Sequence, residues 1–487
     1  MRPLKKALCV GLALCLLFSA AALAEPPAMP DGQPPQMTGG FSDGMGGPGM
    51  GGPGGGGSKP ESYDALWSYS LNEELEGEEF ESTGKDENAI LVTGGNVTVS
   101  ESSISRNSGD STGGDSASFY GVGAAVLVTG GSVTVEDCEI ETDAKGGAGV
   151  FAYGDGIAVV KDTDIVTEKD TSGGIHVAGG GTLYASELTV TTNGESSAAI
   201  RSDRGSGTMI VDGGSYTSNG SGSPAVYVTA DIMIHDAQLM ATGSEALCLE
   251  GLNSVRLYDC ILSGDMPDLP QNDNTWTVIL YQSMSGDAEI GKGRFEMENG
   301  TLIAGNGGVF YTTNTESEFV LSNVLIEAVE YGAYLLRCTG NTNQRGWGAP
   351  GANGAICTFT GIAQAMNGDV IWDSISNLRM YLTEGSVLSG AFVNDESCAG
   401  NGGDGTCTLI IDEDSAWIVT GNSTLTTLCC AGEIYDEAGN LVRIVSPEGI
   451  VFEEGTSEYT VTVRDYTETA DISGAGVATE WNDDFEL

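Results

Sequence analysis

The stretch AAVLVTGGSVTVEDCEI, from Ala124 to Ile140, is the line of sequence that decides the fold. Apolar and polar residues alternate in its two short runs, VLV and VTV, and a pair of glycines separates the runs. Alternation with a period of two is typical of a strand that buries one face, and glycines between such runs indicate a turn. The stretch therefore predicts two short strands joined by a tight turn.

Versions of this line return along the chain. They begin at Ala89, Ala148, Gly173, Ala198, Pro224 and Glu245, and versions with insertions begin at Gly307 and Asp369. Counted from Asp137, the equivalent positions are Asp162, Ala185, Asp212, Asp236 and Asp259, which lie 23 to 27 residues apart. No version has a sustained helical period, so tetratricopeptide and ankyrin arrays are excluded, and the leucine-rich repeat signature is missing.

A repeat of strands without helices predicts an all-β parallel solenoid. One coil of such a solenoid cannot bury its own apolar face, so successive coils stack to create the core. We expect the solenoid to cover residues 89–428 as a single elongated domain. At roughly 4.8 Å per coil, about a dozen coils would form a rod on the order of 60 Å long.

The repeated lines resemble the right-handed parallel β-helix of the pectate-lyase-like superfamily, as found in secreted, adhesin-like bacterial proteins. The later line LIIDEDSAWIVTGNSTLTTL, from Leu409 to Leu428, is similar to the closing coils of autotransporter passenger domains. The resemblance implies that a glycan would lie along one strand face, as it often does in β-helix enzymes that act on carbohydrates.

The segments on either side of the repeats have other compositions. Basic residues, an apolar run and Ala22-Leu23-Ala24 predict a cleaved signal peptide over 1–24, and hence a secreted protein that could associate with the cell surface. Residues 25–60 are rich in Gly, Pro and Met and predict a disordered tether. Residues 61–88 lead into the repeats as an N-terminal cap, and 429–487 are expected to form C-terminal cap strands and a tail.

Charge and cysteine content exclude several classes of function. The net charge of −50 argues against binding to nucleic acid or anionic lipid, because few Lys and Arg are available to neutralise phosphates. No segment after the leader is apolar enough to span a membrane. With only two histidines and no CxxC pair, a structural zinc site is not expected. Two cysteine pairs bracket Gly-rich loops and are candidate disulfides: Cys398 with Cys407, and Cys338 with Cys357.

One acidic position recurs in the repeats as a column of residues: Asp137, Asp162, Asp212, Asp236 and Asp259. Asp side chains bond to backbone N–H groups at turns, which favours a structural role for this turn column. Stacked carboxylates would repel unless donors or cations compensate, so bound calcium is a second reading and catalysis a third.

The first strand of each coil carries a second set of candidates. Its third position holds Leu127, Phe151, His176, Arg201, Tyr227 and Cys248. We expect this position to face solvent, because the opposite orientation would bury His176 and Arg201 in the core without partners. Aromatic and hydrogen-bonding groups suit a sugar chain, and the predicted ligand-binding patch is Phe151, Tyr153, His176, Arg201, Asp203, Tyr227 and Glu250. Two alternatives remain: an exposed sheet whose outward side chains bind no ligand, or a surface covered by the insertions after Asp265 and Gly340.

Catalytic and metal sites have weaker support, and no catalytic residue is assigned. Asp203 and Glu250 could act as acid and base on a glycosidic bond, and Arg201, Arg204 or His176 could serve a lyase. The motifs GHG with RIK of polygalacturonases and RxPxxR of pectate lyases are absent. Calcium could bind in the loop from Asn394 to Cys407, whose candidate ligands are Asp395, Glu396 and Asp404.

The sequence therefore favours an exported, non-catalytic, adhesin-like protein that binds a polysaccharide or a host or cell-surface glycan along a β-helix face. A polysaccharide lyase or glycoside hydrolase is the first alternative. A structural component of a surface layer is the second.

Overall fold

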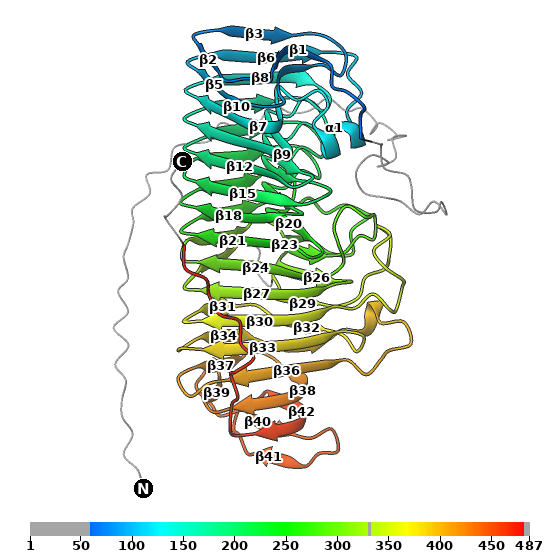
Figure 1. Cartoon of the computed structure of the whole chain (residues 1–487). Helices are drawn as coiled ribbons and strands as arrows, with labels where there is room; N and C mark the ends of the chain where they lie inside the picture. Colours follow the sequence, from blue (N-terminus) through cyan, green and yellow to red (C-terminus); the bar gives the residue numbers. More distant parts are fainter. Residues whose placement is uncertain (1–58, 330–332, 482–487) are drawn as a thin grey trace, which may run out of the picture. The chain divides into compact units, whose positions relative to one another are not determined.

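The computed structural model describes residues 59–329 and 333–481 (Figure 1). In these residues one helix, α1 (Asp115–Tyr120), and one 3₁₀ helix, Glu396–Cys398, accompany 42 strands, so the expectation of an all-β protein is confirmed. Neither helix in this part of the chain has the length and apolar character needed to cross a membrane. The predicted leader, 1–24, and all but the last two residues of the predicted tether, 25–60, lie outside the described residues.

The strands pair in parallel with strands about one repeat later. Ile175 is in register with Val150 of the preceding repeat and with Ile200 of the following one. Two or three successive strands make one coil, and the coils place their strands on three faces (Figure 1). Long parallel sheets of this kind are compatible with a β-solenoid.

The first face begins each coil. Its strands are β1 (Ala65–Tyr69), β4 (Asn88–Val92), the first half of β7 (Val126–Glu136), the first half of β9 (Val150–Lys161), β11 (Ile175–Ala178), β14 (Ile200–Ser202), β17 (Val226–Val228), β20 (Leu247–Glu250), β23 (Trp276–Tyr281), β26 (Gly308–Thr313), β29 (Leu336–Cys338), β32 (Val370–Trp372) and β35 (Phe392–Asn394).

The second face follows it. Its strands are β2 (Glu73–Glu76), β5 (Asn96–Ser100), the second halves of β7 and β9, β12 (Gly181–Ser186), β15 (Gly207–Asp212), β18 (Asp231–His235), β21 (Ser254–Tyr258), β24 (Lys292–Glu298), β27 (Glu316–Ser322), β30 (Ile356–Ile362), β33 (Asn377–Thr383), β36 (Thr406–Ile411), β38 (Ser423–Cys430) and β42 (Thr460–Thr467).

The third face closes each coil. Its strands are β3 (Glu79–Ser82), β6 (Ser103–Ser108), β8 (Glu139–Ala144), β10 (Asp164–Thr167), β13 (Thr189–Thr192), β16 (Ser215–Ser218), β19 (Gln238–Ala241), β22 (Ile261–Gly264), β25 (Thr301–Ala304), β28 (Leu325–Ala328), β31 (Ala365–Asn367), β34 (Val387–Gly390), β37 (Ala416–Val419) and β39 (Glu433–Asp436). After them, β40 (Arg443–Val445) pairs with β42 and, in antiparallel fashion, with β41 (Val451–Glu453).

The opening stretch of the sequence forms one strand where two were predicted. β7 runs through the corner at Gly130 and Gly131, with a shift of register against β9 at that point. Gly131 has a φ of 73°, which the absence of a side chain makes inexpensive. Because β7 and β9 belong to both faces, the first and second faces form one continuous sheet.

The core lies between the three faces and is filled by the alternating apolar residues. Val150, Ile175 and Ile200 lie in register and are fully buried. In the middle of the stack phenylalanines replace them, and the rings of Phe310 and Phe319 lie 5.3 Å apart. Burying each such side chain contributes roughly 2 kcal/mol, and it depends on the neighbouring coil being in place.

The turn column occupies the corner between the second and third faces. Asp137, Asp162, Asp236 and Asp259 have φ values of 51°, 43°, 47° and 54°, a left-handed conformation that Asp tolerates better than most residues. Two positions assigned to the column from the repeats were wrong. Asp212 is the last residue of β15, and Gly213 takes its place; Ala185 is buried within β12, and Glu187 takes its place. The reason is the register of pairing: Ser186 pairs with both Lys161 and Asp212, so the turn residues that follow them are Asp162, Glu187 and Gly213.

The C-terminal segment runs back along the second face (Figure 1). The backbone N–H of Gly476 donates to Thr360 Oγ1 at 2.8 Å, and Arg294 donates to the carbonyl oxygen of Val477 at 2.6 Å. Trp481 stacks on His235, with ring centroids 4.9 Å apart. These contacts join the last described residues to coils in the middle of the stack.

Neither predicted disulfide is formed, because all nine cysteines from Cys138 to Cys430 are free thiols. Cys407 lies inside the core, whereas Cys398 is half-buried in the 3₁₀ helix outside it, so the coil wall separates this pair. Cys338 and Cys357 are both buried in the core. A hydrogen bond with Cys357, together with burial, raises the pKa of the Cys338 thiol.

Candidate functional site

The third positions of the first-face strands form a column that points away from the core. Leu127, Phe151, His176, Arg201, Tyr227 and Cys248 are in register from coil to coil. None of them belongs to the main core cluster; Leu127 and Phe151 form part of one separate cluster, and Cys248 forms part of another. The predicted orientation of this column is therefore confirmed.

The predicted exposure of this patch was wrong. Five of its residues are buried, and two are half-buried; the buried ones are Phe151, His176, Arg201, Asp203 and Glu250, and the half-buried ones are Tyr153 and Tyr227. The reason is that segments outside the repeat cover the first face. A covered surface was one of the two alternatives, but α1 and the segment after β23 cover most of the patch, whereas the insertions after Asp265 and Gly340 pack farther along the face.

Helix α1, which lies between β6 and β7, covers one end of the patch. It ends at Tyr120 and is capped by Gly121, whose φ is 75°. A Cβ at this position would lie 2.6 Å from Leu127 Cδ1 and 2.9 Å from Phe151 Cγ, so only glycine lets the helix end this close to the face. Farther along, Met266 and Trp347 from two insertions pack on Tyr281 and Tyr311.

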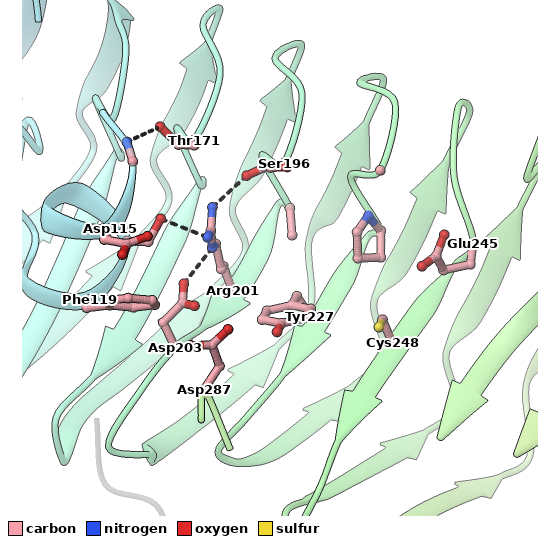
Figure 2. A pocket seen from close by; sticks show the side chains of 15 residues that line it. Asp115, Phe119, Thr171, Ser196, Arg201, Asp203, Tyr227, Glu245, Cys248 and Asp287 are labelled. Carbon is pink, nitrogen blue, oxygen red and sulfur yellow. Dashed lines mark hydrogen bonds and ion pairs between the residues drawn. The ribbon is translucent and has the colours of Figure 1, made fainter. Parts of the chain in front are cut away.

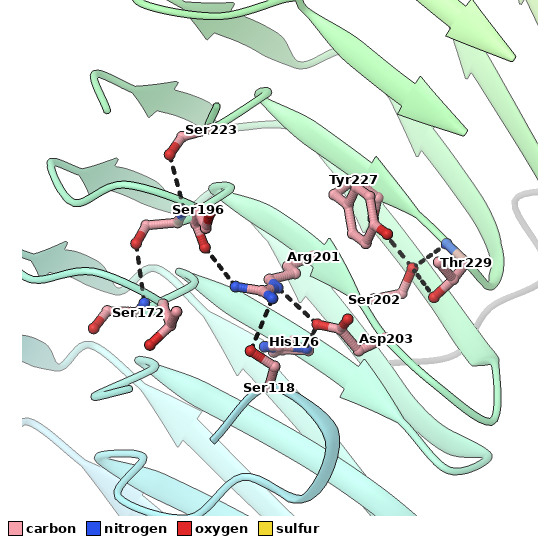
Figure 3. Close-up of polar contacts among 12 residues, drawn as sticks. Ser118, Ser172, His176, Ser196, Arg201, Ser202, Asp203, Ser223, Tyr227 and Thr229 are labelled. Carbon is pink, nitrogen blue, oxygen red and sulfur yellow. Dashed lines mark hydrogen bonds and ion pairs between the residues drawn. The ribbon is translucent and has the colours of Figure 1, made fainter. Parts of the chain in front are cut away.

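Arg201, Asp203 and His176 form a buried polar network under α1 (Figure 3). Arg201 Nε donates to Asp203 Oδ2 at 2.7 Å, and His176 Nε2 lies 3.0 Å from the same oxygen. The guanidinium also donates to Ser118 Oγ on α1 at 2.9 Å and to the carbonyl oxygen of Ser196 at 2.5 Å. Arg201 therefore joins the helix, the strand and the neighbouring turn.

His176 is held neutral in this network. It is fully buried, and its ring stacks on Phe151 with centroids 4.1 Å apart. Burial lowers its pKa to about 4, because loss of water opposes the charged form more strongly than Asp203 favours it. The hydrogen bond to Asp203 places the proton on Nε2 and leaves Nδ1 as a buried acceptor without a partner in the described part of the chain. His176 is thus a positioning residue within the wall of the site.

A second arginine joins α1 to an insertion. Arg204 donates to Asp287 Oδ1 at 2.8 Å, and its guanidinium lies 4.1 Å from the ring centroid of Phe119. Asp287 lies between β23 and β24, and Phe119 is buried on α1. The charge–ring contact and the ion pair hold these two covering segments over the coil of β14.

Between these segments lies a pocket with an empty volume of about 600 Å³, part of it open to solvent (Figure 2). We call it the α1 pocket; its lining includes Phe119, Arg201, Asp203, Tyr227, Glu245 and Asp287. Among the described residues of the lining, Arg201 is the single cation beside four carboxylates, the fourth being Asp115. The pocket therefore combines two aromatic rings with an excess of hydrogen-bond acceptors.

Glu250 is not in the lining of this pocket, although it binds Tyr227, which is. Its carboxylate accepts hydrogen bonds from the backbone N–H of Ser283 at 3.1 Å, from Tyr281 Oη at 3.1 Å and from Tyr227 Oη at 3.3 Å. Burial raises the pKa of Glu250, partly offset by the bonds from Ser283. The expected pairing of Asp203 with Glu250 across one groove is therefore wrong, because Glu250 is used to fix Tyr227 and the insertion after β23.

The predicted calcium ligands do not converge on one point. Asp395 pairs with Arg337 at 2.7 Å and accepts from the backbone N–H of Ser397 at 3.0 Å. Glu396 accepts from the backbone N–H of Ser374 at 3.0 Å. Glu396 and Asp404 line another pocket, of about 720 Å³, without Asp395. No group of three or more metal-ligating side chains is found in residues 59–329 and 333–481.

Comparison with models of protein families finds no family that matches this chain, and comparison with curated proteins finds no match either. Glu245 and Asp287 were missed by sequence reasoning, because Glu245 opens a repeat line without a distinctive pattern and Asp287 lies in an insertion. Arg201, Asp203 and Tyr227 were expected on this face, and the α1 pocket brings them together.

Proposed function

We propose that this protein is an exported, adhesin-like, right-handed parallel β-helix that binds a short glycan in the α1 pocket and does not cleave it. The long parallel sheets and the resemblance of the repeats to pectate-lyase-like proteins support the fold in this proposal. The signal-like N-terminus supports export. A net charge of −50 makes nucleic acid an unsuitable partner.

The composition of the α1 pocket carries the proposal. Small-ligand sites are usually concave and combine aromatic side chains with a few polar groups, and the partly open α1 pocket has a lining of this kind. Phe119 and Tyr227 offer rings to the flat C–H faces of a sugar, and Arg201 and Asp203 offer hydrogen-bonding groups to its hydroxyls. Because covering segments flank the pocket, a chain end or a short saccharide suits it better than the middle of a long polymer.

Two glycines allow a matched test of this site. Gly222 lines the pocket, whereas Gly77 lies between β2 and β3. Their φ values are 62° and 69°, and a Cβ at either would meet no atom within 4 Å. Replacing either residue by Trp therefore imposes similar backbone strain, of about 1–2 kcal/mol. We expect Gly222→Trp to fill the pocket and weaken glycan binding at least about tenfold, while Gly77→Trp binds like the parent protein.

The measurement is a glycan array followed by calorimetric titration of each hit. Circular dichroism of both variants checks that they remain folded. An array without signal for the folded parent protein, or equal affinities of Gly222→Trp and Gly77→Trp, would contradict the proposal.

A carbohydrate-cleaving enzyme is the second candidate, because Asp203 and Asp287 both line the α1 pocket. Two carboxyl groups that face one cavity can divide acid and base roles on a glycosidic bond. Incubation with neutral and acidic polysaccharides, followed by assays for new reducing or unsaturated ends, tests this candidate. The enzyme reading requires products that disappear in Asp203→Asn and Asp287→Asn, and it fails if no polysaccharide is cleaved.

A further inference from the structure

The described residues that line the α1 pocket include more carboxylates than cations. Arg201 is already paired with Asp203 at 2.7 Å, and Arg204 is already paired with Asp287 at 2.8 Å. Arg201 and Arg204 are the cations that reach the pocket from the coil of β14, and each of them already has a carboxylate partner. A carboxylate of the lining that has no cation of its own is then open to a cation from outside.

Glu245 is such a carboxylate. Its residue is 7% exposed, and one of its oxygens, Oε2, accepts a hydrogen bond from Ser244 Oγ at 2.6 Å. Among the described residues no Lys, Arg or His forms an ion pair with it, and Oε1 has no hydrogen-bond partner there. Figure 2 shows the carboxylate at the far side of the pocket from Arg201. Oε1 is not among the unpartnered atoms that are sealed from solvent, so a positive charge or a donor that enters the pocket can reach it.

The remaining lining suits a ligand that is a sugar with one positive group. The ring of Tyr227 lies between Arg201 and Glu245 in Figure 2, where it can contact a sugar ring or the face of a cation. At the other end, Arg201 and Asp203 together with Thr171 and Ser196 form a polar wall that can bind hydroxyls. An acidic sugar would meet an excess of carboxylates, and a chain of net charge −50 would repel it further.

We propose that the α1 pocket selects a saccharide that carries a free, protonated amine, with Glu245 as the counter-ion of that amine. This inference rests on the proposed glycan-binding function and names the class of glycan. A glucosamine-type residue has both the ammonium group and the hydroxyls that the two ends of the pocket would bind. An N-acetylated residue lacks the charge and so loses the contact with Glu245.

Three disaccharides of similar size provide the test by calorimetric titration of the full exported chain. They are the glucosamine dimer of chitosan, the N-acetylglucosamine dimer of chitin and cellobiose, all at mildly acidic pH where the amine is protonated. We expect the glucosamine dimer to bind at least about tenfold more tightly than either neutral dimer. We also expect its affinity to fall as salt increases.

The variant Glu245→Gln keeps the shape of the side chain and an acceptor for Ser244, and it removes the charge. It should lower affinity for the glucosamine dimer by about tenfold and leave affinity for cellobiose unchanged. Glu139→Gln is the matched control, since it removes one charge at an exposed site on the third face. This control should bind all three sugars like the parent protein.

Two other outcomes distinguish a failure of this inference from a failure of the proposed glycan-binding function. Equal binding of charged and neutral dimers, unaffected by Glu245→Gln, would overturn the inference and leave the glycan-binding function standing. Binding of spermidine, with no binding of any saccharide, would overturn both and would assign the pocket to an amine that is not a sugar.

Discussion

At the scale of single residues, the charge of His176 follows from its surroundings. The imidazole is sealed from water by Phe151 and α1, and it contributes one hydrogen bond to Asp203. Histidine in an unfolded chain has a pKa of about 6.5, whereas in the folded protein the pKa is about 4. Between these values the unfolded chain binds a proton that the folded chain does not.

The contribution of His176 to the free energy of unfolding should therefore decrease as the pH is lowered. Because the folded pKa is the lower one, its contribution is complete above pH 6.5 and is lost progressively as pH falls toward about 4. The full loss is about 3 kcal/mol. In His176→Gln, which retains an N–H for Asp203 and does not titrate, urea unfolding should show a smaller decrease over this range. Identical pH dependence in the two proteins would contradict the prediction.

At the scale of elements, α1 acts as a short cover that depends on its docking. A helix of six residues is too short to be stable alone. It is held by Ser118, which accepts from Arg201, and by Phe119, which lies under Arg204. Because both arginines come from the coil of β14, the cover and the polar wall of the pocket form together.

Substitution at Gly121 should release this cover. In Gly121→Ala the new Cβ would approach Leu127 Cδ1 to 2.6 Å, so the helix must move away from the face. Gly77→Ala, between β2 and β3, is the control, because its φ of 69° is also positive and its Cβ would meet nothing within 4 Å. We expect Gly121→Ala to cost about 1–3 kcal/mol more than Gly77→Ala and, unlike the control, to speed hydrogen exchange in α1. Equal exchange in the two variants would show that the close approach is unimportant.

At the scale of the whole described molecule, the C-terminal segment ties coils together that are far apart in the sequence. Glu296 is fully buried, and it accepts from Arg294 at 2.7 Å and from Thr479 Oγ1 at 3.0 Å. Trp481 reaches the coil of β18 and stacks on His235. Such contacts should make unfolding more cooperative, because most coils of the stack contact only their neighbours.

The variant Trp481→Ala should loosen this segment. Loss of the stacked ring removes about 0.5–1.5 kcal/mol, so the amide of Gly476, which donates to Thr360, should exchange several-fold faster. Val477→Ala is the control in the same segment, since its side chain is 76% exposed and its carbonyl oxygen still binds Arg294. Exchange that is unchanged in Trp481→Ala would mean that the backbone bonds alone hold the segment.

Much of the repeating structure could be predicted from the amino-acid sequence. The alternation in the line that contains Phe151 and Val150 indicated the strand and which side chain points outward. The place of Asp137 and Asp162 at turns followed from their spacing. The same reasoning misplaced Asp212 by one residue, because local spacing varies within a coil and only pairing with the next coil decides the register.

The sequence by itself determined the period, the all-β class and the orientation of the first-face column, because these depend on local alternation that every coil repeats. Only the tertiary structure decided that the column is covered, that Glu250 serves as a buried anchor, and that Glu245 and Asp287 share a pocket with Arg201. The physical reason is that the covering segments are inserted once and have no period. Where they settle is decided by single contacts, such as those of Arg201 and Arg204, between residues far apart in the chain.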